Sequence, residues 1–550
     1  MSRPRKIVVI GGVAGGMSAA TRLRRLDEKA NIVVLERSGF VSYANCGLPY
    51  HLSDTIEKRS LLILQNPVSL GARFNLDVRV RHEVLSIDRE AKTVTIFDRV
   101  WKVTYVEKYD FLVLSPGAAA VMPEGADSKW ILAMRTVEDM DKAIAWLYPN
   151  PKSAVIVGGG FIGLELAENL LKRGMSVTLI HRGKQLLSYL DPELAIAIAQ
   201  RVRVAGVDLR LGSAVESFQR TSVTLVGGEV VPADVIFSAM GVKPEITLAV
   251  EAGLRIGANG GIWVDDLQRT SDPHIFAVGD AAEKIDAISG DERLATLAGL
   301  ANRHGHSVAN AIAGADTISA TPSLGTSIVS FDGLVAATVG WSEKALRASG
   351  RKVRVIHTHP ADHAAYYPGA QTMRFKLMVD PDTDLILGAQ AVGGNGVDKR
   401  IDVISTAMFA GITASQLAQL ELAYDPQHGS AKDPINMLGY VNRNIAQGLT
   451  QVVEWHEIES LSQQGFTIVD VRTEGEHKYG HIAGSVNYPL DVLRDHIQEL
   501  KGHRVVVYCQ VGQRGHTAAR VLAQEGIEVF NLNGGYLTYK AGLASIGDQK

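Results

Sequence analysis

The chain has 550 residues, which is too long for a single hydrophobic core, so about three or four domains of ordinary size are expected. Its 56 Lys and Arg residues nearly balance 59 Asp and Glu residues, and the formal net charge of -3 gives no electrostatic reason to expect a nucleic-acid or acidic-membrane partner. With only two cysteines, Cys46 and Cys509, a disulfide framework is excluded, and any function of these residues depends on a reactive thiol.

The first predicted unit is a strand, a glycine turn, a helix and a second strand. Residues 6–10 (KIVVI) read as a buried parallel strand, GGVAGG as the turn, and NIVVLE as the strand that ends at Glu36. In such a unit the helix N-terminus holds a pyrophosphate and the acidic residue accepts the ribose hydroxyls. Val13 stands where the fingerprint has its middle glycine. The candidate cofactor residues here are Gly11, Val13, Ala14, Gly16, Glu36, Arg37 and Gly117.

The same N-terminus imitates a secretory signal, with a basic start followed by an apolar run. The apolar run breaks at Gly11 and Gly12, so a strand is the favoured interpretation. No apolar stretch approaches the roughly 18 residues that a membrane-spanning helix needs. We therefore expect a cytoplasmic protein without membrane contact.

The helix of this unit contains TRLRRL, in which Arg22 and Arg25 are three residues apart. This spacing places both cations on one face of the helix, where they could bind the phosphates of a substrate. A solvated helix face is the alternative.

Cys46 follows in FVSYANCGLPYH, after Asn45 and before Pro49. Asn is a good N-cap and Pro is favoured in a first helical turn, so we expect Cys46 at a helix N-terminus, where the dipole lowers the pKa of the thiol. An inert buried cysteine is the alternative. Since no second cysteine is close in sequence, a local redox disulfide is excluded. A sulfenic acid cycle remains, or a mixed disulfide or persulfide with an outside thiol.

A second dinucleotide fingerprint begins at residue 154 in AVIVGGGFIGLELAENL, where Gly158, Gly160 and Gly163 match it fully. The next strand, SVTLIHR, ends at His181 and Arg182 in place of an acid. A basic pair there favours the 2′-phosphate of NADPH, although Arg182 could simply be a solvated surface residue, so NADH and NADPH both remain open.

The stretch RTSDPHIFAVGDAAE, residues 269–283, predicts a loop, a strand and then Gly279 and Asp280 at the start of a helix. An aspartate at that place can accept a hydrogen bond from a flavin ribityl hydroxyl while the helix N-terminus faces phosphate. One fingerprint is therefore expected to bind a flavin dinucleotide and the other a nicotinamide dinucleotide.

Together these motifs resemble the flavoprotein disulfide reductases, in which the NAD(P) domain interrupts the FAD domain. SYANCGLPY with GGVAGG resembles the branch of coenzyme A disulfide reductases and NAD(P)H-dependent persulfide reductases. The resemblance implies FAD, NADPH or NADH, a homodimer, and coenzyme A as substrate or as a bound mixed disulfide. The related NADH oxidases and peroxidases carry a histidine in the first glycine turn, where this chain has Ala14.

The resemblance also implies roles for particular side chains. Arg25, Ser42 and Asn45 correspond to the substrate pocket around Cys46. Tyr366 in AAYYPGAQT and Tyr424 in LAYDPQHGSAKDPINMLGY correspond to tyrosines that reach the partner's active site. Tyr367, next in the chain, makes the assignment of Tyr366 less firm than that of Tyr424.

The last hundred residues follow a polar join at 441–451 (VNRNIAQGLTQ). The run HRVVVYC predicts a strand with Cys509 at its end, and QVGQRG a loop that leads into the helix HTAARVLAQEG. Backbone N–H groups of such a loop form a cradle for an anionic sulfur, and Arg514 adds charge. Cys509 and Arg514 enclose four residues, one fewer than the loop of cysteine phosphatases. With DVR and GHIAGS, this segment resembles a rhodanese domain.

The expected fold class is α/β, with two Rossmann-like domains, an α+β dimerisation domain and a C-terminal α/β rhodanese domain. We predict an FAD domain at 1–117 and 246–322, an NAD(P) domain at 118–245, a dimerisation domain at 323–445 and a rhodanese domain at 452–550. The predicted activity is reduction of coenzyme A disulfide, coenzyme A persulfide or polysulfide through Cys46, with Cys509 carrying sulfane sulfur. The alternatives are an NADH oxidase or peroxidase that uses a Cys46 sulfenic acid, and a persulfide sensor or carrier. No metal site is expected.

Overall fold

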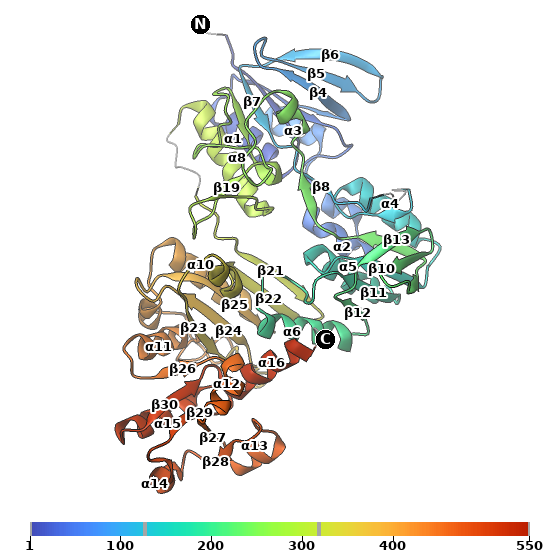
Figure 1. Ribbon diagram of the computed structural model, residues 1–550. Helices are drawn as coiled ribbons and strands as arrows, with labels where there is room; N and C mark the ends of the chain where they lie inside the picture. The colour runs from blue at the N-terminus through green and yellow to red at the C-terminus, as the bar shows by residue number, and fades with distance from the viewer. Residues whose placement is uncertain (1–2, 125–128, 316–320, 548–550) are drawn as a thin grey trace. The chain divides into compact units, whose positions relative to one another are not determined.

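The computed structural model describes residues 3–124, 129–315 and 321–547 (Figure 1). These residues form two compact units. The first contains Met1–Arg182 and Ser213–Gly325, and the second contains Gly183–Gly212 and Thr326–Lys550. The short segment 183–212 therefore packs with the C-terminal part of the chain, although it lies within the predicted NAD(P) domain.

The first unit contains a five-stranded sheet with the order β18-β7-β1-β2-β3. All its neighbouring strands are parallel, as expected for a Rossmann-like domain. A three-stranded antiparallel sheet, β4-β5-β6, lies beside it. The strands are β1 Lys6–Ile10, β2 Asn31–Glu36, β3 Asp77–Val80, β4 His82–Asp88, β5 Thr93–Asp98, β6 Val103–Lys108, β7 Phe111–Leu114 and β18 Ile275–Ala277. The helices are α1 Ala14–Leu26, α2 Leu48–Leu52, α3 Pro67–Phe74, α7 Thr247–Glu251 and α8 Ala298–Ala313, with the 3-10 turns η1 Asn45–Gly47, η2 Arg59–Leu62 and η3 Gly279–Ala281.

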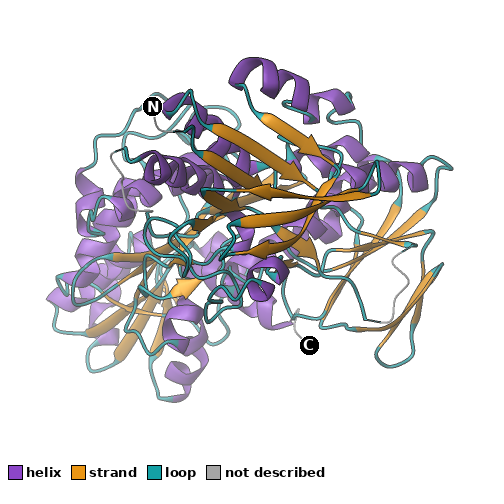
Figure 2. Cartoon of the chain, turned by 90° about the horizontal axis from the view of Figure 1, so that it is seen from above, coloured by secondary structure: helices purple, strands orange, loops and turns teal. Residues whose placement is uncertain are grey.

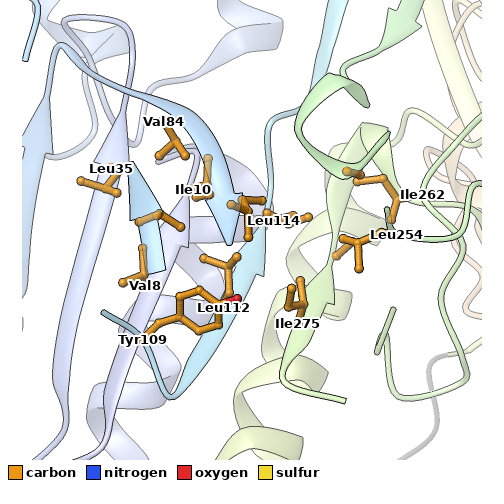
Figure 3. Close-up of a cluster of buried hydrophobic side chains, with 14 of the residues drawn as sticks. Val8, Ile10, Leu35, Val84, Tyr109, Leu112, Leu114, Leu254, Ile262 and Ile275 are labelled. Carbon is orange, nitrogen blue, oxygen red and sulfur yellow. The ribbon is translucent and has the colours of Figure 1, made fainter. Parts of the chain in front are cut away.

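One hydrophobic core joins the two sequence segments of this domain (Figure 3). Val8 and Ile10 of β1 pack with Leu112 and Leu114 of β7, and Ile275 of β18 belongs to the same cluster. Residues more than 200 positions apart thus bury their apolar surface together. On the other face of the sheet α1 and α8 approach so closely that a Cβ on Gly305 would lie 2.3 Å from the carbonyl oxygen of Gly15.

The second Rossmann-like part lies in the same unit and contains the parallel strand order β11-β10-β16-β9. Two small antiparallel sheets, β13-β14-β15 and β17-β8, accompany it, and β19 pairs with β20. The strands are β8 Ala118–Ala120, β9 Ile131–Leu132, β10 Ser153–Val157, β11 Ser176–His181, β13 Val215–Gln219, β14 Ser222–Leu225, β15 Val230–Pro232, β16 Val235–Ser238, β17 Val242–Pro244, β19 Lys284–Ile285 and β20 Glu292–Arg293. Its helices are α4 Val137–Leu147 and α5 Phe161–Lys172.

The second unit begins with an antiparallel five-stranded sheet, β21-β22-β25-β24-β23. Its strands are β21 Ser327–Phe331, β22 Leu334–Gly340, β23 Arg354–Thr358, β24 Arg374–Val379 and β25 Ile386–Gly393. The associated elements are α6 Pro192–Val204, β12 Asp208–Leu211, α9 Glu343–Ala348, α10 Val397–Phe409, η4 Ser415–Gln419 and α11 Pro434–Ala446.

The C-terminal sheet is parallel, with the order β26-β30-β29-β27-β28. Its strands are β26 Gln451–Val453, β27 Thr467–Asp470, β28 Val486–Asn487, β29 Arg504–Tyr508 and β30 Glu528–Leu532. Its helices are α12 Ile458–Gln463, α13 Glu474–Tyr479, α14 Ile497–Leu500, α15 Gln513–Gln524 and α16 Gly535–Gly547, with η5 Trp455–Glu457 and η6 Leu493–His496. Strands and helices alternate along this region of the chain, as expected for an α/β domain. Figure 2 shows the helices and strands of the chain by colour.

The predicted join at 441–451 is wrong in part, because α11 continues to Ala446 and β26 begins at Gln451. Polar residues on the exposed face of an amphipathic helix resemble a linker in sequence. The two parts of this unit are also held together by Asn533. Its side-chain oxygen accepts from the backbone N–H of His357 at 2.9 Å, and its amide donates to the carbonyl of Val355 at 3.0 Å.

The expected α/β class, with two Rossmann-like parts, an α+β part and a C-terminal α/β domain, is confirmed. Across the described residues, the model contains no helix that is both long and apolar enough to cross a membrane.

Candidate functional site

The first glycine turn brings β1 and α1 together by close backbone approach. Gly11 has φ +97°, and a Cβ there would lie 2.0 Å from the carbonyl oxygen of Ser115. A Cβ on Gly16 would lie 2.0 Å from the carbonyl oxygen of Gly11. Val13 precedes α1 and makes no side-chain cap, and Ala14 is the first helical residue. In the first turn the N–H of Gly16 donates to the hydroxyl of Ser115 at 3.0 Å.

Glu36 is buried at the end of β2, where sequence reasoning placed it. Its two carboxylate oxygens accept from the backbone N–H groups of Gly12 at 2.9 Å and Ser38 at 2.8 Å. A pocket of about 340 Å³ opens here and is lined by Gly11, Glu36 and Arg37, among others. Arg37 pairs with Glu245 at 3.1 Å. Gly117 has φ +75° and open space around its missing side chain.

The second glycine turn repeats this arrangement between β10 and α5. A Cβ on Gly158 would lie 2.1 Å from the carbonyl oxygen of Ala239, and a Cβ on Gly163 would lie 1.9 Å from that of Gly158. Gly160 differs, because nothing lies within 4 Å of its missing Cβ and no side chain caps α5. Packing therefore requires Gly158 and Gly163, whereas the open space at Gly160 is available to a pyrophosphate.

The two basic residues after β11 are not equivalent. Nδ1 of His181 accepts from the backbone N–H of Gly159 at 3.2 Å, and burial, together with Arg182, lowers the pKa of His181. The lowered pKa leaves Arg182 as the main positive charge of the two, and the role of this basic pair toward a 2′-phosphate stays a prediction. Arg182 is exposed.

Asp280 forms an ion pair with Arg135, a residue that the sequence patterns did not single out. Gly279 and Asp280 lie in the 3-10 turn η3, so the helix predicted to start there is wrong. The buried Lys284 donates to the carbonyls of Gly279 and Ala282, and burial lowers the pKa of its amine to about 8. Gly279 itself has φ +79°, a conformation that suits glycine.

Cys46 lies in the three-residue turn η1, with an exposed and unpaired thiol. Asn45 is not an N-cap, because it is the first residue of η1 and Gly47 is the N-cap of α2; its amide donates to the carbonyl of Arg135 at 2.7 Å. The α2 helix that follows has only five residues. The pKa of Cys46 is raised, first by desolvation and then by Glu165, while Arg135 opposes this rise. The prediction that a helix dipole lowers the pKa of Cys46 is therefore wrong, because the surrounding protein raises this pKa.

Glu165 on α5 is the second titratable group beside Cys46. Burial, reinforced by Glu168, raises the pKa of Glu165 to about 7. A strongly perturbed carboxyl next to a free thiol is typical of a functional site. Ser42, four residues before Cys46, adopts φ +47°, and its N–H donates to the carbonyl of Gly12 at 2.8 Å. This bond ties the Cys46 segment to the first glycine turn.

Arg22 and Arg25 both lie on α1. Desolvation, and after it these two arginines, lower the pKa of His306 on α8, so the positive charge of this region comes from the arginines. Arg22 is half-buried and donates to Asn310 at 3.1 Å, whereas Arg25 is exposed. The intervening Arg24 is buried and donates to backbone carbonyls, which is a structural role.

In the second unit Tyr366 and Tyr424 come together, with their hydroxyl oxygens 3.1 Å apart. They are 76% and 48% exposed, which is unusual for large aromatic side chains. This hydrogen bond with Tyr366 is the first cause of the raised pKa of Tyr424. Tyr367 instead packs edge-on against His363. A pocket of about 690 Å³ is lined by Tyr424, Lys399 and His428, among others.

Cys509 follows β29 directly and is 0% exposed. The backbone N–H of Gly512 points at its sulfur, with N and Sγ 3.2 Å apart. The helix α15 begins at Gln513, so Arg514 lies in the first helical turn and not in the loop where it was expected. Arg514 forms two hydrogen bonds with Glu476, of 2.8 and 2.6 Å. Glu476, and after it Cys509, raise the pKa of Arg514.

Comparison with known proteins supplies the family. The model for the pyridine nucleotide-disulphide oxidoreductases matches residues 5–359, their dimerisation domain matches 326–433, and the rhodanese-like domain matches 454–541. The chain belongs to this family. It is 35% identical to a Staphylococcus aureus coenzyme A disulfide reductase over 436 residues, 79% of this chain and 99% of the relative.

Two solved structures resemble nearly the whole chain. The reduced Bacillus anthracis CoADR-RHD has a TM-score of 0.96 and 42% identity over 98% of both chains. A NAD-dependent persulfide reductase from A. fulgidus has a TM-score of 0.89 and 33% identity, covering 97% of this chain and 100% of the other. This oxidoreductase therefore combines the fold of its family with a C-terminal rhodanese-like domain.

Members of this family use FAD and a nicotinamide nucleotide, and the residues present fit both groups. Two helix N-termini whose N-cap residues make no side-chain cap, the acidic Glu36 and the open space at Gly160 are features that two dinucleotides need. The individual ligand roles and the predicted domain boundaries remain predictions. The residues that sequence reasoning missed are Arg135, Glu165, Lys284, His306 and Glu476, and of these only Glu165 lies inside a motif that had been quoted.

Proposed function

We propose that this oxidoreductase reduces the disulfide or persulfide of coenzyme A with electrons from NADH or NADPH, acting as a homodimer. Cys46 is the nucleophile, and Cys509 carries sulfane sulfur. The proposal is supported by the names of its relatives, a coenzyme A disulfide reductase and a persulfide reductase.

The observation that carries the proposal is the Tyr366–Tyr424 pair. Two exposed tyrosines from distant segments share a hydrogen bond on the unit that contains the dimerisation domain. Exposed phenols can donate to a thiolate that leaves during disulfide exchange. In a homodimer the pair would serve the Cys46 of the partner subunit.

The proposed chemistry balances as a thiol–disulfide exchange followed by a two-electron reduction. The Cys46 thiolate attacks one sulfur of coenzyme A disulfide, so a mixed disulfide forms and one coenzyme A thiolate leaves. FAD, when bound, would pass two electrons from NAD(P)H to this mixed disulfide. Reduction releases the second coenzyme A thiolate and restores Cys46. With coenzyme A persulfide, the same attack on the outer sulfur makes a Cys46 persulfide, whose reduction releases hydrogen sulfide.

Glu165 and Arg135 act on Cys46 in opposite directions. Arg135 favours the thiolate, whereas Glu165 disfavours it while ionised. Because the pKa of Glu165 is about 7, this carboxyl can hold or release a proton near the operating pH. Arg22 and Arg25 offer positive charge for the phosphates of coenzyme A.

The first test is anaerobic NADH and NADPH oxidation with coenzyme A disulfide, coenzyme A persulfide and peroxide. We expect turnover with the sulfur substrates, loss of nearly all of it in Cys46→Ser, and little turnover with peroxide. Cys509→Ser shows whether the rhodanese-like domain is needed. Consumption of peroxide or oxygen alone would establish the oxidase alternative, and a negligible rate with every substrate would favour a sensor.

A further inference from the structure

The two arginines near Cys509, Arg472 and Arg514, each form an ion pair with a carboxylate. Arg514, the guanidinium group within hydrogen-bonding reach of the sulfur, gives both of its Nη groups to Glu476. Arg472 donates to Asp470 at 2.7 Å and to Gln510 in the Cys509 loop at 3.1 Å. Each arginine of this site therefore faces its own carboxylate.

The loop adds hydrogen-bond donors but no net charge. Its side chains are Gln510, Val511, Gly512 and Gln513, all uncharged. The Gly512 N–H and the tight backbone around Gly535 enclose the sulfur. In this loop a donor molecule thus meets peptide dipoles and neutral side chains, and the two neighbouring arginines, Arg472 and Arg514, each face a carboxylate.

Sulfur donors differ in the charge that they bring. A thiol-bound persulfide reacts with the Cys509 thiolate in its protonated form, R–S–SH, in which the two reacting sulfur atoms carry no charge, whereas thiosulfate approaches as a dianion. Like charges at close range cost free energy unless a free cation compensates them. The Arg514–Glu476 pair removes that cation.

We propose that Glu476 makes the rhodanese-like domain selective for thiol-bound persulfides over thiosulfate by occupying Arg514. This inference rests on the proposed role of Cys509 as a sulfur carrier. Glu476 acts through Arg514, so it is a specificity-determining residue and not a catalytic one.

Glu476 is held in place independently of Arg514. It is the third residue of α13, and its carboxylate accepts from the backbone N–H and hydroxyl of Thr473, each at 3.0 Å, as part of a capping box. The Arg514 hydrogen bonds, with those from Thr473, lower the pKa of Glu476 to about 2. The carboxylate is therefore ionised at any pH at which the protein works.

The transfer steps balance for both donors. With a persulfide, the Cys509 thiolate attacks the outer sulfur of R–S–SH, the S–S bond breaks, and R–S⁻ leaves. With thiosulfate, the same attack on the outer sulfur expels sulfite. Cyanide, used as acceptor, then takes the outer sulfur of the Cys509 persulfide as thiocyanate and restores the thiolate.

The test uses full-length protein that carries the Cys46→Ser substitution. It measures the single-turnover rate at which Cys509 takes up sulfur, detected as a mass increase of one sulfur atom. The donors are glutathione persulfide and thiosulfate. Glu476→Gln keeps the capping geometry and removes the charge, and Glu474→Gln is the matched control, since this exposed residue on the same helix lies 4.0 Å from Lys478. We expect Glu476→Gln to raise the thiosulfate loading rate about tenfold, the effect of one freed charge-assisted hydrogen bond.

The persulfide rate should change by less than about threefold, and Glu474→Gln should change neither rate. In the double variant Glu476→Gln, Arg514→Gln the gain with thiosulfate should disappear. Equal loading of the parent protein by both donors, or a rate ratio unaffected by Glu476→Gln, overturns the specificity proposal while leaving Cys509 as a carrier. A parent protein that no donor loads overturns the carrier function itself.

Discussion

At Cys46 the groups that set the pKa of the thiol come from three separate parts of the chain. Glu165 lies on α5, Arg135 follows β9, and Asp280 lies in η3. The local sequence around Cys46 predicted a lowered pKa, but the two acids and desolvation raise it. The reactivity of this thiol is thus decided by tertiary neighbours, to which a bound flavin would add.

Replacing Glu165 with Gln should lower the pKa of Cys46, because the ionised carboxylate is the largest charge effect that raises it. The measurement is the rate of thiol alkylation by iodoacetamide as a function of pH in Cys509→Ser protein. The midpoint should move to lower pH. Glu216→Gln, which removes an exposed carboxylate on β13, serves as the control, and an unchanged or higher midpoint in Glu165→Gln would contradict the assignment.

The positive region formed by Arg22 and Arg25 on α1 supports a second prediction at this scale. Arg25→Ala should raise KM for coenzyme A disulfide roughly three- to tenfold, because an exposed arginine–phosphate contact is worth about 1 kcal/mol. Pantethine, the disulfide that lacks the nucleotide phosphates, should show an unchanged KM. Lys29→Ala, a nearby exposed cation, is the control. An equal effect on both substrates would assign Arg25 to folding and not to phosphate binding.

At the scale of elements, β24 connects to α6 and α9 through one buried cation. Lys376 is 2% exposed and its amine lies 3.0 Å from Asp191 and 2.7 Å from Glu343, with Glu193 as a third partner. These three acids have the spacing of a metal site, but the lysine ammonium group already supplies the positive charge. The strongly raised pKa of Lys376 results from the three carboxylates overcoming the cost of burial.

Lys376→Met should therefore destabilise the second unit by about 3 to 5 kcal/mol, because it leaves buried carboxylates without a counter-charge. Scanning calorimetry of the full chain would show a lowered transition. Lys352→Met is the matched control. Lys352 and its partner Asp382 are both exposed and 3.5 Å apart, so its loss should cost under about 0.5 kcal/mol. A loss of similar size in both variants would refute the idea.

At the scale of the whole molecule, the rhodanese-like domain is fastened to the dimerisation part by buried polar contacts. Asn533 bonds to the backbone of β23 and also donates to Glu454 at 2.8 Å. A carboxylate oxygen of Glu454 lies 3.7 Å from Nε2 of His357. The charges of Glu343, Lys376 and Glu193 also act on the Glu454 carboxyl. Burial above all raises the pKa of Glu454 to about 8.

This shift makes the junction sensitive to pH. The folded protein holds the Glu454 proton more tightly than the unfolded chain, so the stabilisation is complete below the unfolded pKa of about 4.5 and is lost as the pH rises towards 8. Glu454→Gln should remove this dependence, with a difference from wild type of about 1 to 3 kcal/mol between pH 5 and pH 8.

The readout is hydrogen exchange of the β26 amides, Gln451–Val453, in both proteins at pH 5 and pH 8. Wild-type β26 should open more readily at pH 8 than at pH 5 after correction for intrinsic exchange, and the variant should not. Glu459→Gln, an exposed nearby acid, is the control. A wild-type junction equally stable at both pH values would contradict the raised pKa.

Much of the architecture was predictable because its signals are local. Each strand, glycine turn and helix N-terminus lies within about twenty consecutive residues, and the close contacts of Gly11, Gly16, Gly158 and Gly163 explain why these positions are glycine. The C-x4-R loop of Cys509 is equally short. By contrast, the capping role assigned to Asn45 was wrong, because the 3-10 turn begins at Asn45 itself and α2 begins only after Gly47.

The sequence by itself determined the α/β class, the two dinucleotide fingerprints, the single thiol in each of two sites and the family to which they point. Only the tertiary structure decided that Tyr366, and not Tyr367, meets Tyr424, that Glu165 opposes ionisation of Cys46, and that Glu476 occupies Arg514. The physical reason is the distance along the chain over which each property is decided. Backbone geometry follows from neighbouring residues, whereas charge, burial and hydrogen-bond pairing depend on side chains that folding brings together from distant positions.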